Sequence, residues 1–207
     1  MIESAKLKLA VPINEHDHVI GPAQARVSVV TYGDYDCPAC RSCHCAAEKM
    51  SAELRGTVRL VYRHFPLLKI HPRALRAAEA AETAAAQGKF WEMHRLLYSR
   101  SNKLKDRDLR RHAQTIGLDL ARFDHEMATR THADRIRKNY YDSINKGISG
   151  APTTFVNGVM YAMSGVELLS EVKTTLHNLS HQSFGMVEDA QRHMTLARPF
   201  KGNDKVE

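Results

Sequence analysis

Long apolar runs are absent from this chain of 207 residues. No stretch approaches the roughly 18 apolar residues that a membrane-spanning helix needs, so we expect no membrane partner. The segment Met1–His18 has only a short apolar stretch, broken by Lys8 and Pro12, and so lacks the apolar core of a signal peptide. We therefore expect a cytoplasmic location, or a periplasmic one if a leader has been removed from the chain.

Cysteine is scarce, and all of it lies in one place. The four cysteines fall within one short segment: Cys37, Cys40, Cys43 and Cys45. Thiols so close together cannot cross-link distant parts of a fold, which excludes a disulfide framework. The cluster therefore indicates a site. A hydrophobic content of 43% allows the rest of the chain to bury one core.

Signatures of nucleic-acid binding are also missing, although the net charge is +7. The charges between Arg100 and Lys146 alternate with acids along expected helix faces, and there is no helix–turn–helix or aromatic binding sheet. We expect no nucleic-acid partner. His16 and His18 flank Asp17 in an expected loop, and without a third ligand we interpret them as exposed polar residues.

The segment Cys37-Pro38-Ala39-Cys40 joins a β-branched strand to an expected helix. A cysteine in the first turn of a helix is close to unpaired backbone N–H groups and the positive end of the helix dipole, which favour the thiolate. A second cysteine three residues later lies one turn away and can attack a mixed disulfide formed at the first. Cys37 and Cys40 are therefore the candidate catalytic residues.

The remaining pattern predicts a mixed α/β fold. Pro152 begins a β-branched strand, where a cis X–Pro bond is plausible, and Asn157-Gly158 is typical of a tight hairpin turn. The expected elements are strand 26–32, helix 37–54, strand 57–64, a helical block from about 70 to 146, strands 152–157 and 159–163, and helix 166–179.

Together with Tyr32–Asp36 before the cysteines and Arg63–Leu67 after the next strand, these motifs resemble the DsbA-like branch of the thioredoxin superfamily. The resemblance extends from about His18 to Leu179. It implies a thioredoxin-like fold with an inserted helical domain. We expect an N-terminal extension at 1–18, a thioredoxin-like domain at 19–67 and 147–180, the insertion at 68–146, and a weak helix and tail at 181–207.

The resemblance also implies a mechanism. It assigns the nucleophile to Cys37 and the resolving thiol to Cys40, with no cofactor and no metal. The implied partners are client proteins with thiols or disulfides, and glutathione or a thioredoxin-type reductant. The implied substrate-binding residues surround the thiols: Pro38, Ala39, Ala151 and Pro152.

Two features depart from the family pattern. Thr31 occupies a position where many relatives have an acid that handles the proton of the second thiol, so Asp34, Asp36 or water would have to substitute. The dipeptide Pro38-Ala39 lacks the histidine of the strongly oxidising relatives, which predicts an intermediate potential.

Two alternatives stay open. A glutathione-dependent transferase or isomerase on the same fold would not need paired thiols. A metal-binding module could use the four cysteines if their segment were a loop. A continuous helix would hold the four thiols too far apart to bind one ion. The helicity of residues 41–54 therefore decides between a metal-binding module and a redox site. The residues there are good helix formers.

Overall fold

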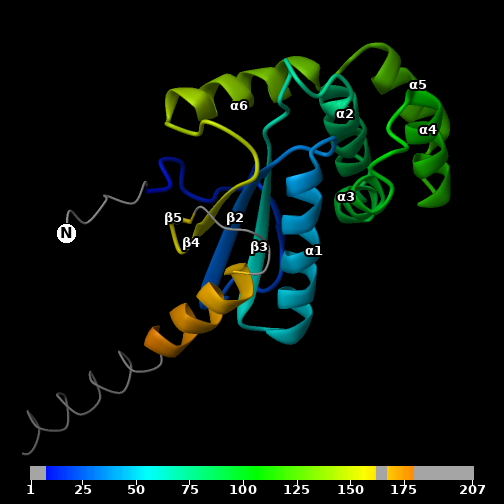
Figure 1. The fold of residues 1–207 in the computed structure, drawn as a ribbon. Coiled ribbons are helices and arrows are strands. Elements are labelled where there is room, and N and C mark those ends of the chain that lie inside the picture. Colours follow the sequence, from blue (N-terminus) through cyan, green and yellow to red (C-terminus); the bar gives the residue numbers. More distant parts are fainter. Residues whose placement is uncertain (1–7, 162–166, 180–207) are drawn as a thin grey trace, which may run out of the picture.

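The computed structural model of the protein describes residues 8–161 and 167–179. Within them, five strands form one sheet with the order β1-β3-β2-β4-β5 (Figure 1). Strands β2 and β3 are parallel, and the other neighbouring pairs are antiparallel. The strands are β1 (His18–Ile20), β2 (Val27–Gly33), β3 (Val58–His64), β4 (Thr153–Val156) and β5 (Val159–Tyr161).

Strand β2 is central because its sequence is apolar on both faces. Successive side chains of a strand point to opposite sides of the sheet. Val27 and Val29 accordingly pack in one core cluster, while Val30 and Tyr32 pack in another on the opposite side. Five of the seven residues of β2 are buried, which suits a strand covered on both faces.

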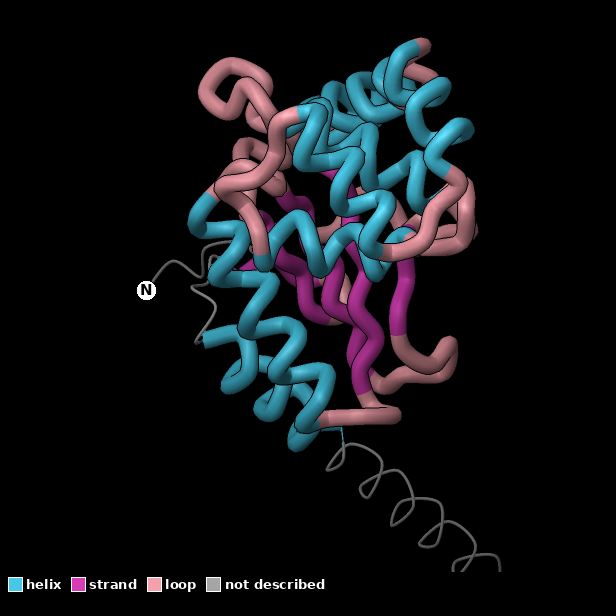
Figure 2. The backbone as a smooth tube through the Cα atoms, turned by 90° about the vertical axis from the view of Figure 1, so that its right-hand side faces the viewer, coloured by secondary structure: helices cyan, strands magenta, loops and turns pink. Residues whose placement is uncertain are grey.

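Helix α1 (Pro38–Glu53) connects the parallel strands β2 and β3, as a crossover connection must. Ala47 and Met50 of α1 pack against Val29 on one face of the sheet. The helix at 167–179 joins the same core through Leu168 and Val172. In Figure 2 the inserted helices lie above the strands, and further helices run alongside them.

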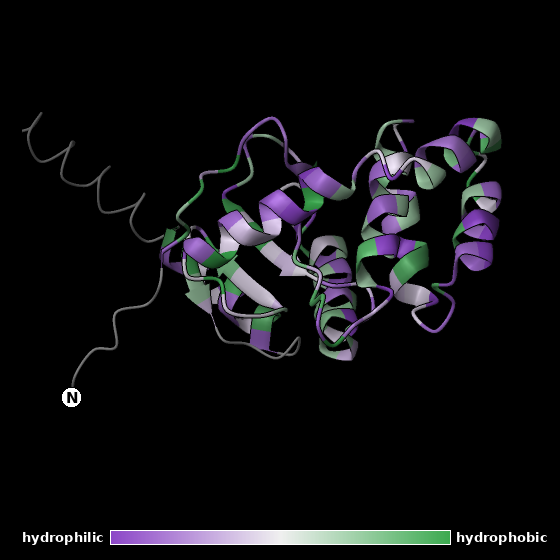
Figure 3. Ribbon diagram, turned by 90° about the horizontal axis from the view of Figure 1, so that it is seen from above, coloured by the Kyte–Doolittle hydropathy of each residue, from purple (hydrophilic) through white to green (hydrophobic). Residues whose placement is uncertain are grey.

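Five helices lie between β3 and β4 in the sequence. Ala-rich α2 contacts each of the other four, because its small side chains allow close approach. Figure 3 shows most of this insertion as a cluster beside the sheet, with hydrophobic and hydrophilic residues alternating along its helices. The helices are α2 (Ala74–Ala85), α3 (Phe90–Ser99), α4 (Asp106–Thr115), α5 (Leu120–Ala128) and α6 (Ala133–Asn145).

The apolar stripes of the inserted helices form the core of the insertion. Met93, Leu97 and Leu109 are fully buried, so these helix faces pack inward. The stripe of α6 is an exception at its end, where Ile144 is 41% exposed. Helix α6 instead contributes Tyr140, whose ring contacts Phe65 at a centroid distance of 4.7 Å on the second face of the sheet.

The prediction of four strands was incomplete, because β1 was missed. Its three residues carry no local alternation that could identify it, and it forms by pairing with β3. The expected strand 159–163 is observed as β5, and residues 162–163 lie outside the described ranges. The expected tail at 181–207 also lies outside them. Among the described helices, none combines the length and the apolar character needed to cross a bilayer.

Candidate active site

Cys37 is the N-cap of α1, at the carboxyl end of β2. Its backbone is extended, with φ −94° and ψ 120°, and its Sγ accepts a hydrogen bond from the Cys40 backbone N–H at 3.3 Å. Pro38 follows in the first turn, where the absence of a backbone N–H is tolerated. The sulfur of Cys37 therefore lies among the unpaired N–H groups of a helix start, as the sequence predicts.

Cys40 lies one turn further and is only 2% exposed. Burial raises the pKa of its thiol far above the ordinary value, and the hydrogen bond with Cys37 and the charge of Cys37 raise it further. Cys40 is therefore held as the protonated thiol, chiefly by its burial. The two thiols differ in environment as an attacking and a resolving cysteine would.

The segment before β4 completes the surroundings of Cys37. The Cys37 Sγ–H donates to the Ala151 carbonyl oxygen at 3.7 Å, and the Ala151–Pro152 peptide bond is cis. Pro38 and Ala39 are exposed on the first turn of α1, whereas Ala151 and Pro152 are partly buried. The structure thus brings together all six residues that the sequence analysis named.

The other two cysteines have different environments. Cys43 is buried, its Sγ lies 3.6 Å from the Thr154 Oγ1, and burial raises its pKa. Cys45 is exposed. Helix α1 is continuous to Glu53, which confirms the helicity expected for this segment. A continuous helix argues against a metal site made of the four cysteines. Among the described residues, the one grouping suited to a metal contains no cysteine.

Asp34 and Asp36, considered as substitutes for the acid missing at Thr31, make different contacts. Asp34 is fully buried and accepts hydrogen bonds from the backbone N–H of Leu67 at 2.8 Å and from His71 Nδ1 at 2.9 Å. Its charge also contributes to the raised pKa of Cys40, which places it near that thiol. Asp36 instead pairs with Arg73, whose Nε lies 3.1 Å from its Oδ2.

A cluster of buried aromatic rings supports the loop before Cys37. The Tyr35 hydroxyl lies 2.9 Å from His94 Nδ1, and burial holds the pKa of His94 well below its ordinary value. Gly33 permits this packing, since a Cβ there would lie 2.6 Å from the ring of Tyr62. Gly33 is the last residue of β2.

A groove of about 930 Å³ begins beside the thiols and follows the exposed face of α1. Pro38 and Cys45 are among its lining residues. Arg41 and Lys49 also line it, and neither has an ion-pair partner within the part of the chain that the structure describes. Its free cationic groups therefore give the groove a positive character.

Sequence reasoning missed a second cluster of ionisable residues. His18 was interpreted as exposed, but its side chain is 17% exposed and its Nε2 lies 3.0 Å from Glu82 Oε1. His64 faces the same oxygen. The sequence feature that could have revealed this cluster is Glu82. It lies within the Ala-rich run of α2, on the helix face that is buried together with the neighbouring alanines, and a buried acid needs a partner.

Comparisons with known proteins place this fold in a family. The sequence model of a family described as thioredoxin matches residues 13–173. A thioredoxin-like oxidoreductase from Silicibacter pomeroyi DSS-3 is 26% identical, with a TM-score of 0.68 over 79% of this chain and 94% of that chain. BdbD from Bacillus subtilis shares the fold, with a TM-score of 0.69 and 20% identity over 83% of this chain and 97% of that one. The chain therefore belongs to the thioredoxin family, and it shares the fold of both of these proteins.

A curated relative is longer than this chain. The Na(+)/H(+) antiporter NhaA 3 of Salinispora tropica is 44% identical over 153 residues, which are 73% of this chain but 23% of that protein. The chain thus spans about a quarter of the length of the curated relatives it matches. The transport named there is a property of those whole proteins.

Proposed function

We propose that the chain exchanges two electrons with protein disulfides through Cys37 and Cys40. The Cys37 thiolate attacks one sulfur of a client disulfide, which forms a mixed disulfide and releases the other client sulfur as a thiolate. The Cys40 thiolate then attacks the Cys37 sulfur, and the client leaves with its second thiol. The client gains two electrons, and the Cys37–Cys40 disulfide holds the oxidised state. The reverse sequence oxidises a client dithiol.

The observation that carries this proposal is the difference between the two sulfurs. Cys37 Sγ accepts the Cys40 backbone N–H at the start of α1, an interaction that favours a negative sulfur. Cys40 is buried beneath it, and its pKa is raised by that burial. A nucleophile at the helix start and a protected thiol one turn below are what attack followed by resolution requires.

The surroundings support a docking role for the segment before β4. The Ala151 carbonyl lies beside Cys37 Sγ, and Pro152 presents no backbone N–H next to it. An extended client segment could pair with this edge while its sulfur meets Cys37. Pro38 and Ala39 are exposed next to it and would contact the same client.

The groove along α1 extends this surface. Its unpaired Arg41 and Lys49 favour clients with acidic residues near their disulfide, because opposite charges accelerate encounter. We assign the flanking part of the client to this groove and the sulfur-bearing part to the Ala151–Pro152 edge.

The direction of electron flow and the partners follow from the reduction potential of the Cys37–Cys40 pair. Without a histidine between the cysteines or an acid at Thr31, the potential is expected to be less oxidising than that of the His-containing relatives. In a cytoplasmic glutathione pool the pair would then be largely reduced, and would reduce or isomerise client disulfides. Glutathione or a thioredoxin-type reductant would regenerate it. A transferase acting on glutathione alone would have no use for the buried Cys40.

The test is the reduction of insulin by dithiothreitol, followed by turbidity. The wild type should accelerate it, and Cys37→Ser should abolish the acceleration because no mixed disulfide can form. Cys45→Ser is the matched control: it removes an exposed thiol from the same helix and should keep the wild-type rate. An unchanged rate in Cys37→Ser would refute the proposal.

A further inference from the structure

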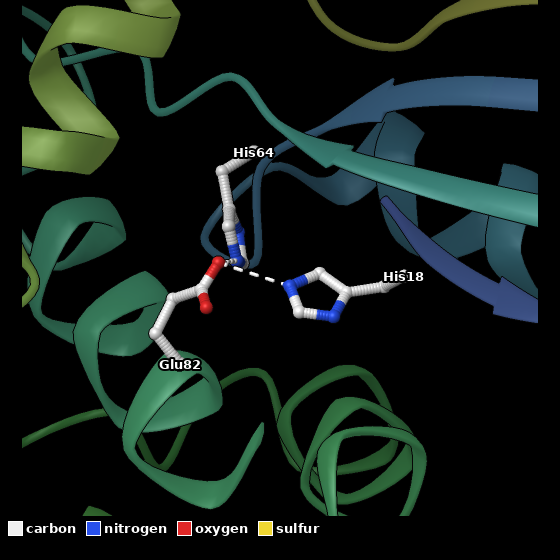
Figure 4. Close-up of side chains that lie close together, drawn as sticks. All are labelled: His18, His64 and Glu82. Carbon is white, nitrogen blue, oxygen red and sulfur yellow. Dashed lines mark hydrogen bonds and ion pairs between the residues drawn. The ribbon is translucent and has the colours of Figure 1, made fainter. Parts of the chain in front are cut away.

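Three side chains of types that commonly bind metal ions converge where the sheet faces the inserted helices. His18 comes from β1, His64 from the end of β3 and Glu82 from α2, and Figure 4 shows their side chains converging. Glu82 Oε1 lies 3.0 Å from His18 Nε2 and 3.1 Å from His64 Nε2. The three ligand atoms all lie within 4.8 Å of one another.

The fold leaves this cluster incompletely satisfied. The side chains of His64 and Glu82 are each 6% exposed. Although His64 Nε2 is near Glu82, the geometry makes no hydrogen bond, and neither ring nitrogen of His64 has a hydrogen-bond partner. A buried imidazole nitrogen without a hydrogen bond costs free energy, and His64 Nε2, 3.1 Å from Glu82 Oε1, is available to a cation between the two atoms.

Neighbouring residues hold the three ligands in place. The His18 ring stacks on Phe90, with centroids 3.5 Å apart and an angle of 7° between the planes. The His64 ring packs edge-on against Tyr62 at 5.3 Å. Arg135 of α6 binds Glu82 Oε2, so Oε1 is the oxygen left to face the histidines. Supporting contacts of this kind orient the ligands of metal sites.

We propose that His18, His64 and Glu82 form a binding site for one zinc ion. Two imidazole nitrogens and a carboxylate oxygen are a set that zinc accepts, at bond lengths of about 2.0 to 2.2 Å. Tetrahedral bonds of that length separate neighbouring ligand atoms by roughly 3.3 to 3.5 Å, close to the two observed nitrogen–oxygen separations. A cavity of about 250 Å³, lined by all three residues, gives room for water as the fourth ligand.

Zinc at this position would tie α2 to the edge of the sheet, where β1 and β3 already pair through their backbones. The site is separate from the thiols and does not depend on the proposed redox function. It departs from the expectation of no metal, because His64 and Glu82 supply the further ligands that the sequence did not show beside His18. Metal binding here should therefore stabilise the fold without using any sulfur.

The test is a titration of the full-length chain, with Cys37 and Cys40 oxidised to a disulfide so that they cannot bind metal. After chelator treatment, calorimetry with Zn²⁺ should find one equivalent bound, and zinc should raise the midpoint of thermal unfolding. The affinity for zinc should fall in both His18→Gln and Glu82→Gln. The fall should exceed the roughly 10- to 100-fold loss that follows when a residue supporting a metal ligand is replaced. His16→Gln is the matched control, because His16 lines the same cavity but its side chain is 83% exposed.

Co²⁺ provides a readout that does not require a variant to fold. It should give visible bands of a four-coordinate site without the intense near-ultraviolet band of cobalt–thiolate bonds. The double variant Cys43→Ser, Cys45→Ser should bind zinc like the wild type. The proposal is overturned if the wild type binds no zinc, if a thiolate band appears, or if His18→Gln and His16→Gln bind equally well.

Discussion

The sulfur of Cys37 lies 3.7 Å from the carbonyl oxygen of Ala151, although the two residues are 114 positions apart in the sequence. The contact joins the start of α1 to the segment that leads into β4. It gives a client segment a backbone acceptor next to the sulfur that would attack it. The proposed docking of a client depends on this pair.

Replacement of Pro152 should therefore disturb client release. Pro152→Thr introduces a backbone N–H beside the Ala151 carbonyl and should change how a docked client leaves. In a Cys40→Ala background, where resolution is blocked, we expect mixed disulfides through Cys37, and severalfold more of them when Pro152→Thr is added. Non-reducing gels of cell extracts measure the trapped species.

The control for this experiment is Cys37→Ser combined with Cys40→Ala, which should trap nothing. If Cys40→Ala traps no client with or without the change at Pro152, the docking role assigned to this segment is wrong. Trapping that persists without Cys37 would point to Cys45, the exposed thiol of α1.

The two active-site thiols should react with alkylating reagents in a fixed order. Burial and the neighbouring Cys37 raise the pKa of Cys40, so Cys40 should stay protonated as the pH rises from mildly acidic to mildly alkaline. Iodoacetamide labelling followed by peptide mapping should find Cys37 modified before Cys40. Labelling of Cys40 before Cys37 would reverse the assignment of nucleophile.

Local sequence patterns were sufficient for much of the site. The step from a β-branched strand to a helix placed Cys37 at the start of α1, because strand and helix periodicities are local properties. The turn at Asn157-Gly158 was also predictable, since both residues have positive φ, 46° and 82°, and such turns favour this dipeptide. The residues on either side of the thiols could therefore be named in advance.

Contacts between distant segments could not be predicted in this way. Strand β1 exists because Val19 pairs with Val61 of β3, and three residues alone contain no such information. His18 looked like a loop residue because its partner Glu82 is 64 positions away. The position of Asp34 near Cys40, which bears on the missing acid at Thr31, also required the fold.

Charge reversal in the groove should change which clients react well. Arg41→Glu with Lys49→Glu should slow the reduction of acidic peptide disulfides by about tenfold at low ionic strength, and added salt should shrink the effect. Stopped-flow rates for acidic and basic peptides measure this. Arg107→Glu with Arg111→Glu on α4 makes the same change in net charge outside the groove, and should leave the ratio of the two rates as in the wild type. Equal effects of both double variants would show that the groove does not select clients.

The most direct test of the central claim is equilibration of the protein with glutathione buffers of defined potential, with the reduced fraction measured by alkylation and mass. Cys37 and Cys40 should oxidise together in one two-electron transition, with a potential between about −270 mV and about −120 mV, the values of thioredoxin and DsbA. Cys45→Ser should retain this transition and Cys37→Ser should lose it. If the wild type shows no two-electron transition, or if Cys37→Ser retains it, the chain is not a dithiol oxidoreductase acting through this pair.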